Sequence, residues 1–365
     1  MEKAFDRVRH CAILKSLSDL DVSIYIIKLI QSYLSQRFQY VEIKGCKSNV
    51  FKSTSGVPQG SNLGPLLFLL AINGIIRNIK NAKALLLADD FKCFLQIDSI
   101  FDCEILQNDF CDVANWCDVN SFKLNVGKCA CMSFTLNNNP ITYNYTLNHE
   151  PLQRVTEHKD LGLIFDTTLS FTGHILSKVE SAHKIAGFIV RSTSKLSVEV
   201  SFHLFDSLVL PILEYGSIIW SPQYDVWVAV IEGVQRRFLK CMYYRTFGIY
   251  PQRGCDNGFL LETFNRLSLN KRRIKIFLCT LFKLLKNEVD CPELLEQLPF
   301  AINRMNSRNS NIFYLAYPRT NLYKNSPIYK LCYYFNFYAS DIDIDSTSLN
   351  RFKKIILNKL KSNVR

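Results

Sequence analysis

Two adjacent carboxylates, Asp89 and Asp90, stand between two apolar runs, where they could support metal-ion chemistry. Residues 84–88 form an all-apolar run, which predicts a strand buried on both faces, and residues 91–97 partly alternate. The sequence therefore predicts a β-hairpin with both carboxylates at its tip. Carboxylates at one sheet edge suit two magnesium ions roughly 4 Å apart, which stabilise an in-line phosphoryl transfer. The alternative is a solvated turn, the commoner meaning of an isolated Asp-Asp pair.

A second motif precedes the hairpin and reads Ser55-Gly56-Val57-Pro58-Gln59-Gly60. Its two glycines allow close backbone approach to a ligand, and the Gln59 amide can both donate and accept hydrogen bonds. Pro65 is suited to the first turn of a following helix. The alternative for this motif is a tight loop that caps a buried helix.

The two motifs in this order, SGVPQG and then Leu87-Ala88-Asp89-Asp90, resemble the B and C motifs of reverse transcriptases from non-LTR retrotransposons of the long interspersed, jockey-like kind. The resemblance implies RNA-directed DNA synthesis with Mg²⁺ as cofactor and with an RNA template, a DNA primer or target and dNTPs as partners. It makes Asp89 and Asp90 the metal-binding catalytic carboxylates. It places Gln59 and Gly60 at the nucleotide. The family commonly has an aromatic residue where this chain has Leu87.

The start of the chain, Lys3-Ala4-Phe5-Asp6, resembles the last four positions of the family's A motif, Asp-x-x-Lys-Ala-Phe-Asp. The resemblance implies that Phe5 excludes a 2′-hydroxyl and that the backbone of Lys3 and Ala4 faces the triphosphate. A core aromatic is the alternative for Phe5. The first metal-binding Asp of the A motif would fall before Met1, so we expect an N-terminally truncated polymerase without fingers motifs. Whether such a chain is an enzyme stays open, because the alternative is an inactive relic that only binds nucleic acid.

Two further segments resemble the family's D and E motifs. Residues 122–129 read FKLNVGKC, and the resemblance makes Lys128 a general acid for pyrophosphate. A surface lysine in a turn is the alternative. Residues 158–162 read HKDLG, and the resemblance makes Leu161 and Gly162 a primer contact. Ordinary tertiary packing is the alternative there.

Basic charge is concentrated downstream of these motifs. The net charge is +12, and residues 231–280 hold ten Lys or Arg against three Asp or Glu. This distribution favours a polyanion partner, although a solvated basic face is the commoner meaning of one charge run. Two clusters are candidate nucleic-acid contacts: Arg236, Arg237 and Lys240 on one side of a predicted helix, and Lys271, Arg272 and Arg273.

The elements that must position these residues follow from periodicity. Helices are predicted over residues 12–20, 24–34, 66–79 and 102–119, and strands over 40–43 and 50–53. Helical spacing dominates from residue 171 onward. We expect an α+β fold, a reverse-transcriptase palm with an antiparallel sheet, followed by a mostly helical thumb and C-terminal region. The expected domains are residues 1–165, 166–290 and 291–365.

Composition limits the remaining classes. A hydrophobic content of 48% supports a sizeable core, and the longest apolar block falls short of the roughly 20 residues that span a bilayer. We therefore expect an intracellular protein without a membrane segment, in nucleus or cytoplasm. The 13 cysteines contain no CxxC and the six histidines no paired spacing, which predicts reduced thiols. No spacing indicates a zinc site, and the alternative is a zinc site assembled from residues far apart in the sequence. A maturase-like splicing factor would need an intron-binding domain that no segment suggests.

Overall fold

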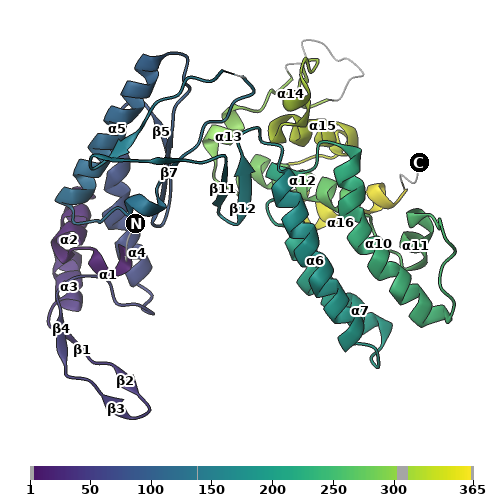
Figure 1. Cartoon of the computed structure of the whole chain (residues 1–365), viewed down its shortest axis with the longest axis horizontal. Coiled ribbons are helices and arrows are strands. Elements are labelled where there is room, and N and C mark those ends of the chain that lie inside the picture. The colour runs from purple at the N-terminus through teal and green to yellow at the C-terminus, as the bar shows by residue number, and fades with distance from the viewer. Residues whose placement is uncertain (1–3, 138, 302–310, 363–365) are drawn as a thin grey trace. The chain divides into compact units, whose positions relative to one another are not determined.

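The computed structural model describes residues 4–137, 139–301 and 311–362 (Figure 1). The chain divides into two compact units, residues 1–156 and 157–365. The first combines helices with short strand pairs, whereas the second is mostly helical. This mixture of helices and small sheets agrees with the expected α+β class.

The helices of the first unit lie close to the predicted ranges. They are α1 (Ala4–Arg7), α2 (His10–Asp19), α3 (Ile24–Leu34), α4 (Gly64–Ile72) and α5 (Ile100–Val119). The helix expected over residues 66–79 changes at Asn73–Gly74 into a 3₁₀ segment, η1 (Asn73–Asn78), because glycine weakens an α-helix. Gly74 also sits against a large side chain: a Cβ there would lie 3.1 Å from Trp116 Cζ2.

The core of the first unit is formed by apolar side chains from α2, α3, α4 and α5, and Phe68 and Phe122 are its largest fully buried members. These two rings meet edge-on with centroids 6.2 Å apart. Phe122 also stacks on Trp116 at 5.5 Å. The apolar positions that predicted the helices therefore converge on one core beneath the hairpin and the glycine-containing loop.

The strands do not form the single antiparallel sheet that was expected. Within the described residues they make six two-stranded sheets, of which one is parallel. The antiparallel pairs are β1 (Arg37–Gln39) with β4 (Phe51–Ser53), β2 (Glu42–Ile43) with β3 (Cys46–Lys47), β5 (Lys83–Leu87) with β6 (Asp90–Phe94), β8 (Thr146–Leu147) with β9 (Glu150–Pro151), and β11 (Glu157–Asp160) with β12 (Leu163–Asp166). β7 (Ala130–Cys131) pairs with β10 (Gln153–Arg154) in parallel. Most strands are too short to support a wide sheet.

One local expectation, about the burial of a strand, is wrong. The strand over residues 84–88 was expected to be buried on both faces, but Leu85 and Leu87 are 57% and 58% exposed. In a two-stranded sheet one face has no layer against it, so only the other, which carries Leu86 and Phe91, contacts the core. The segment 122–129, which resembles the D motif, contains a 3₁₀ turn, η2 (Val126–Lys128).

The second unit continues with helices after the β11–β12 hairpin. They are α6 (Thr172–Ser192), α7 (Val198–Leu204), α8 (Leu210–Glu214), α9 (Ser217–Trp220), α10 (Asp225–Phe247), α11 (Asn257–Thr263), α12 (Leu269–Leu285), α13 (Pro292–Glu296), α14 (Asn321–Asn325), α15 (Pro327–Ala339) and α16 (Leu349–Ser362). A π-helical segment, η3 (Phe205–Val209), precedes α8, where Pro211 lacks the N–H that a regular helix needs.

Two hydrophobic cores hold the second unit together. One is built mainly from α6, α8 and α10, and the other from α12, α15 and α16. In the second core Phe282 stacks on Phe352 with centroids 4.2 Å apart. The described part of the chain has no helix long and apolar enough to cross a membrane.

Two cations are buried among the described residues of this second unit. The Arg273 side chain on α12 is 1% exposed, and its three guanidinium nitrogens have no hydrogen-bond partner within the described residues. Lys330 on α15 is 9% exposed, and its ammonium makes one long hydrogen bond of 3.4 Å to the Ser221 carbonyl. Burial, followed by repulsion from Arg273, lowers the pKa of Lys330 to about 8. A charged Lys330 is therefore costly at neutral pH.

Replacing Lys330 with methionine is expected to stabilise the chain at pH 7 by up to about 3 kcal/mol in the free energy of unfolding. The pKa of Lys330 lies below its ordinary value of 10.5 in the folded state. Between these two pH values the unfolded chain binds more protons, so wild-type stability rises with pH and the advantage of Lys330→Met shrinks. Urea unfolding at several pH values measures this. The exposed Lys354→Met is the matched control, and an equal gain at pH 7 and pH 10 would contradict the explanation.

Candidate functional site

The hairpin that carries the two carboxylates forms as predicted. Leu87 pairs with Asp90, so Ala88 and Asp89 make a two-residue turn, and Ala88 adopts φ +53°. Asp89 is half-buried at this turn and Asp90 is exposed at the start of β6. Both carboxylates therefore lie at one end of the hairpin, where a metal ion or phosphate can reach them.

A buried carboxylate from α5 holds the start of this hairpin. The Asp109 side chain accepts hydrogen bonds from the backbone N–H groups of Lys80, Asn81 and Ala82, at 3.3, 2.8 and 2.6 Å. Although burial opposes the charged form, these backbone donors lower the pKa of Asp109. The charged side chain thus anchors the segment that leads into β5.

The glycine-containing loop docks on α1 and on the residues that follow it. The Gly56 N–H donates to the Val8 carbonyl at 2.8 Å, and the Val57 N–H donates to the Phe5 carbonyl at 2.9 Å. His10 Nε2 lies 3.0 Å from the Gly56 carbonyl oxygen. Segments that resemble the A and B motifs are therefore joined through their backbones.

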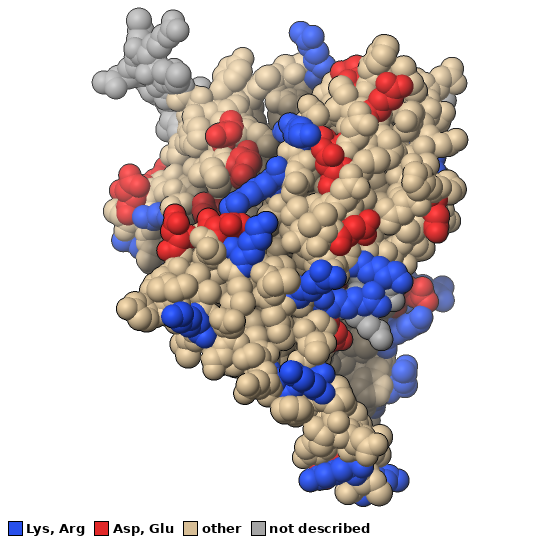
Figure 2. Space-filling model, turned by 90° about the vertical axis from the view of Figure 1, so that its left-hand side faces the viewer, with Lys and Arg blue, Asp and Glu red and all other residues tan. Residues whose placement is uncertain are grey.

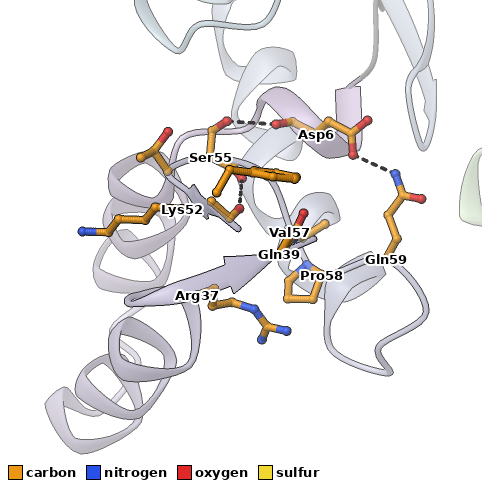
Figure 3. Close-up of a pocket in the computed structure, with 12 residues that line it drawn as sticks. Asp6, Arg37, Gln39, Lys52, Ser55, Val57, Pro58 and Gln59 are labelled. Atoms are coloured by element: carbon orange, nitrogen blue, oxygen red, sulfur yellow. Dashed lines mark hydrogen bonds between the residues drawn. The ribbon is translucent and has the colours of Figure 1, made fainter. Parts of the chain in front are cut away.

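Asp6 makes two further contacts with the same loop (Figure 3). Its carboxylate accepts a hydrogen bond of 2.7 Å from Gln59 Nε2, and its carbonyl accepts one of 3.0 Å from Ser55 Oγ. Asp6 had no predicted role of its own. Its place in the KAFD motif was the available signal, and the structure shows that it orients the Gln59 amide.

Gly56 is required sterically where this loop crosses α1. It has φ +80°, and a Cβ atom there would lie 2.8 Å from the Asp6 carbonyl oxygen and 2.9 Å from both Asp6 Cα and the Phe5 carbonyl oxygen. All three neighbours are backbone atoms, which cannot rotate away. Gly60 has φ +77°, but none of the described atoms lies within 4 Å of a Cβ built there.

Two of the three N-terminal residues expected at the nucleotide, Ala4 and Phe5, lie in α1 where the loop docks. Phe5 is half-buried and stacks on Phe68, with ring centroids 4.3 Å apart and planes inclined by 25°. Ala4 is buried beside it. Lys3 lies outside the described residues. The stack fixes the Phe5 ring, and this position is compatible with both a core aromatic and a gate.

A cavity of about 650 Å³ opens beside the loop. Its lining includes Asp6, Gln59 and residues of the paired strands β1 and β4, among them Arg37, Gln39 and Phe51. In Figure 3 the Asp6 and Gln59 side chains meet at one side of the site, and the Arg37 guanidinium lies on another. Neither Arg37 nor Phe51 was predicted to be a site residue. Alternation along two very short strands was too weak a signal to find them.

The remaining motif residues lie at turns. Lys128 is exposed at the end of η2. Leu161 and Gly162 form the turn between β11 and β12, with φ of 45° and 83°. The Leu161 carbonyl accepts a hydrogen bond of 2.8 Å from the Tyr215 hydroxyl. The HKDLG segment thus forms a turn between two paired strands. Its packing against Tyr215 gives it a structural role, and the primer contact stays a prediction.

The first basic cluster lies on the outside of α10. Arg236 and Arg237 are exposed and Lys240 is half-buried, whereas Ile231, Val234 and Phe238 are buried on the other side of the helix. The predicted amphipathic helix is therefore confirmed. Its exposed cations can face a phosphate backbone, and this role stays a prediction.

The second basic cluster is not a solvent-facing patch. The Lys271 ammonium donates to the Leu360 carbonyl at 2.7 Å. Arg272 forms an ion pair with Glu214, in which its Nη2 lies 3.1 Å from Oε2. Arg273 is buried, as described above. A short run of cations on a helix with one apolar face must place some of them inward, which explains why the expected basic surface at Arg273 is wrong.

The described residues contain no group of three or more His, Cys, Asp or Glu side chains arranged to hold a metal ion. Asp89 and Asp90 nevertheless supply the right donors. Magnesium is held in phosphoryl-transfer sites by one or two carboxylates, with water and substrate phosphates completing its octahedral shell. The carboxylates at the hairpin tip fit that ligand set.

Comparisons with known proteins agree with the motifs. Residues 1–176 match the family described as "Reverse transcriptase (RNA-dependent DNA polymerase)". The chain is similar to the "RNA-directed DNA polymerase from mobile element jockey" of Drosophila funebris, with 29% identity over 229 residues that cover 59% of this chain and 25% of that protein. It is also similar to the "Probable RNA-directed DNA polymerase from transposon BS" of Drosophila melanogaster, with 27% identity over 260 residues that cover 67% of this chain and 29% of that protein. The aligned parts thus span only about a quarter of these relatives.

Proposed function

We propose that this chain carries the palm of an RNA-directed DNA polymerase, because residues 1–176 match the reverse transcriptase family and the chain is similar to the polymerase of the jockey mobile element. The proposed reaction adds a deoxynucleotide to a DNA primer on an RNA template. The observation that carries the proposal is the docking of the Ser55–Gly60 loop on residues 5–10, which brings the A-like and B-like motifs into one site. Residues 166–290 are proposed to act as a helical thumb and residues 291–365 as a C-terminal region.

Each residue of the site has a proposed task. Asp89 and Asp90 would hold Mg²⁺, which when bound stabilises the negative charge on the attacking and leaving oxygens. The Gln59 amide, held by Asp6, would contact the nucleotide paired with the template. Lys128 would donate a proton to the departing pyrophosphate. Such positioned charges and donors supply most of the rate enhancement in phosphoryl transfer.

The direct test is extension of a DNA primer annealed to an RNA template by the purified chain, with and without Mg²⁺. Magnesium-dependent extension is the expected result. The alternative, a catalytically inert relic that only binds nucleic acid, is not favoured by the similarity to polymerases. Salt-sensitive binding with no extension at any Mg²⁺ concentration would overturn the proposal and restore that alternative.

Phe5→Val is expected to admit ribonucleotides. If the Phe5 ring closes the space that a 2′-hydroxyl would occupy, shortening it should raise ribonucleotide incorporation relative to deoxynucleotide incorporation on the order of 10–100-fold. Single-nucleotide incorporation with matched dNTP and rNTP measures the ratio. Phe101→Val, at an exposed position on α5, is the control. An unchanged ratio in a folded Phe5→Val protein would leave Phe5 only its stack on Phe68.

A further inference from the structure

The paired strands β1 and β4 and the β2–β3 hairpin that joins them project from the helices of the first unit as a ribbon, residues 37–53 (Figure 1). The ribbon contains four basic residues and one acidic residue: Arg37, Lys44, Lys47, Lys52 and Glu42. Blue side chains outnumber red ones at the projecting lower end of the face in Figure 2. The net positive charge of the ribbon therefore favours an anionic ligand.

The register of the ribbon assigns its side chains to two faces. Arg37 is paired with Ser53, and Gln39 with Phe51, so these four side chains share one face. Phe38 is paired with Lys52, and the Phe38 ring is 66% exposed on the other face. All four residues of the first face line the 650 Å³ cavity next to Gln59. The ribbon thus contributes a defined wall to the proposed nucleotide site.

The cavity offers three kinds of contact. Within the described residues no carboxylate lies within ion-pair distance of Arg37, whose guanidinium lies over the Tyr33 ring, so its charge can interact with a phosphate. The Phe51 ring is 50% exposed and can stack on a base. The Gln39 amide and the hydroxyls of Ser53 and Thr54 can hydrogen-bond to a base edge or a ribose. The one carboxylate of the lining, on Asp6, already accepts a hydrogen bond from Gln59.

We propose that this face of the ribbon binds the single-stranded RNA template beside the nucleotide site, with Phe51 stacked on an unpaired base and Arg37 on its phosphate. Proteins commonly bind single-stranded nucleic acid through an aromatic ring that stacks on a base and through cations that contact the phosphates. The bases of a duplex are paired and stacked, so a duplex could not insert one into the cavity. The inference rests on the proposed polymerase function, because that function supplies a template. It adds residues that none of the recognised motifs contain.

Binding of a fluorescent single-stranded oligouridine to the full chain, followed by anisotropy, tests the site. Phe51→Ala and Arg37→Ala are each expected to weaken binding on the order of tenfold, and Arg37→Ala should also reduce the salt dependence by about one released ion. Phe38→Ala removes an aromatic ring from the opposite face, and Lys44→Ala removes a charge from the far turn of the ribbon. These controls should bind like wild type. If Arg37→Ala does not fold, Arg37→Gln is the second variant, because it keeps part of the side-chain stem and removes only the guanidinium that lies over the Tyr33 ring.

Several outcomes would overturn the inference. One is wild-type affinity in Phe51→Ala and Arg37→Ala. Equal losses in the two controls would indicate diffuse charge attraction rather than a site, and equal affinity for a blunt RNA duplex would exclude a single-strand site. Primer extension is measured in parallel. If the wild-type chain extends the primer but the variants bind RNA as tightly as wild type, only the inference is wrong. If RNA binding depends on Phe51 and Arg37 but the chain does not extend the primer, only the proposed function is wrong.

Discussion

Asp89→Asn is expected to reduce magnesium-dependent primer extension on the order of 10³-fold or more. Asparagine has nearly the same shape as aspartate but no charge, so it cannot hold a divalent cation against the repulsion of the substrate phosphates. Asp89 is half-buried in the two-residue turn of the β5–β6 hairpin, where the turn itself tolerates asparagine. The change should therefore remove activity without unfolding the first unit.

Single-turnover incorporation of one dNTP measures this loss, and thermal unfolding followed by circular dichroism checks the fold. Asp19→Asn, at an exposed position at the end of α2, removes the same charge far along the chain from the hairpin and should leave the rate unchanged. If Asp89→Asn retained near wild-type incorporation, Asp89 would not be a metal ligand and the hairpin would be an ordinary solvated turn.

Gly56→Ala is expected to lower the free energy of unfolding of the chain by about 2–4 kcal/mol. Two costs combine. An L-residue is strained at φ +80°, and the added Cβ would meet three backbone atoms of Phe5 and Asp6 at 2.8–2.9 Å. The loop must then lift from α1, which should also break the hydrogen bond between Gln59 and Asp6 and weaken nucleotide binding.

Gly45→Ala is the matched control for this prediction. Gly45 has φ +82°, but none of the described atoms lies within 4 Å of a Cβ built there. It therefore carries the backbone strain without the clash. Urea unfolding of both variants separates the two costs, and KM for dNTP reports on the loop. Equal destabilisation by the two substitutions would show that the close approach at Gly56 contributes nothing.

Much of this fold follows from local sequence signals. The helix over residues 24–34 was predicted at its observed bounds, and the carboxylate hairpin forms at the predicted turn. Both depend on periodicity within one element. The β5 strand was misjudged because burial of its second face depends on a neighbouring layer, which no local pattern reports.

The residues of the candidate site that belong to sequence motifs could be predicted, and the others could not. Gln59 and Asp89 stand out through their flanking residues. Asp6 gains its role only because the loop folds back onto α1, and Arg37 lines the cavity only because β1 pairs with β4. Arg273, by contrast, was predicted to be a nucleic-acid contact but is buried. Three consecutive cations indicated an exposed surface, although the helix places one of them inward.

The junction between the Ser55–Gln59 loop and α1 also has a consequence for folding order. Its hydrogen bonds join residues 49 to 53 positions apart, so the chain must close a long loop before any of them forms. That closure costs about 3 kcal/mol in chain entropy and is recovered only by contacts made afterwards. The amide protons of Gly56 and Val57 should consequently exchange with solvent through cooperative opening of the whole junction, rather than by fraying of one helix. We therefore expect the junction to form late in folding and to open early in unfolding, as one cooperative unit.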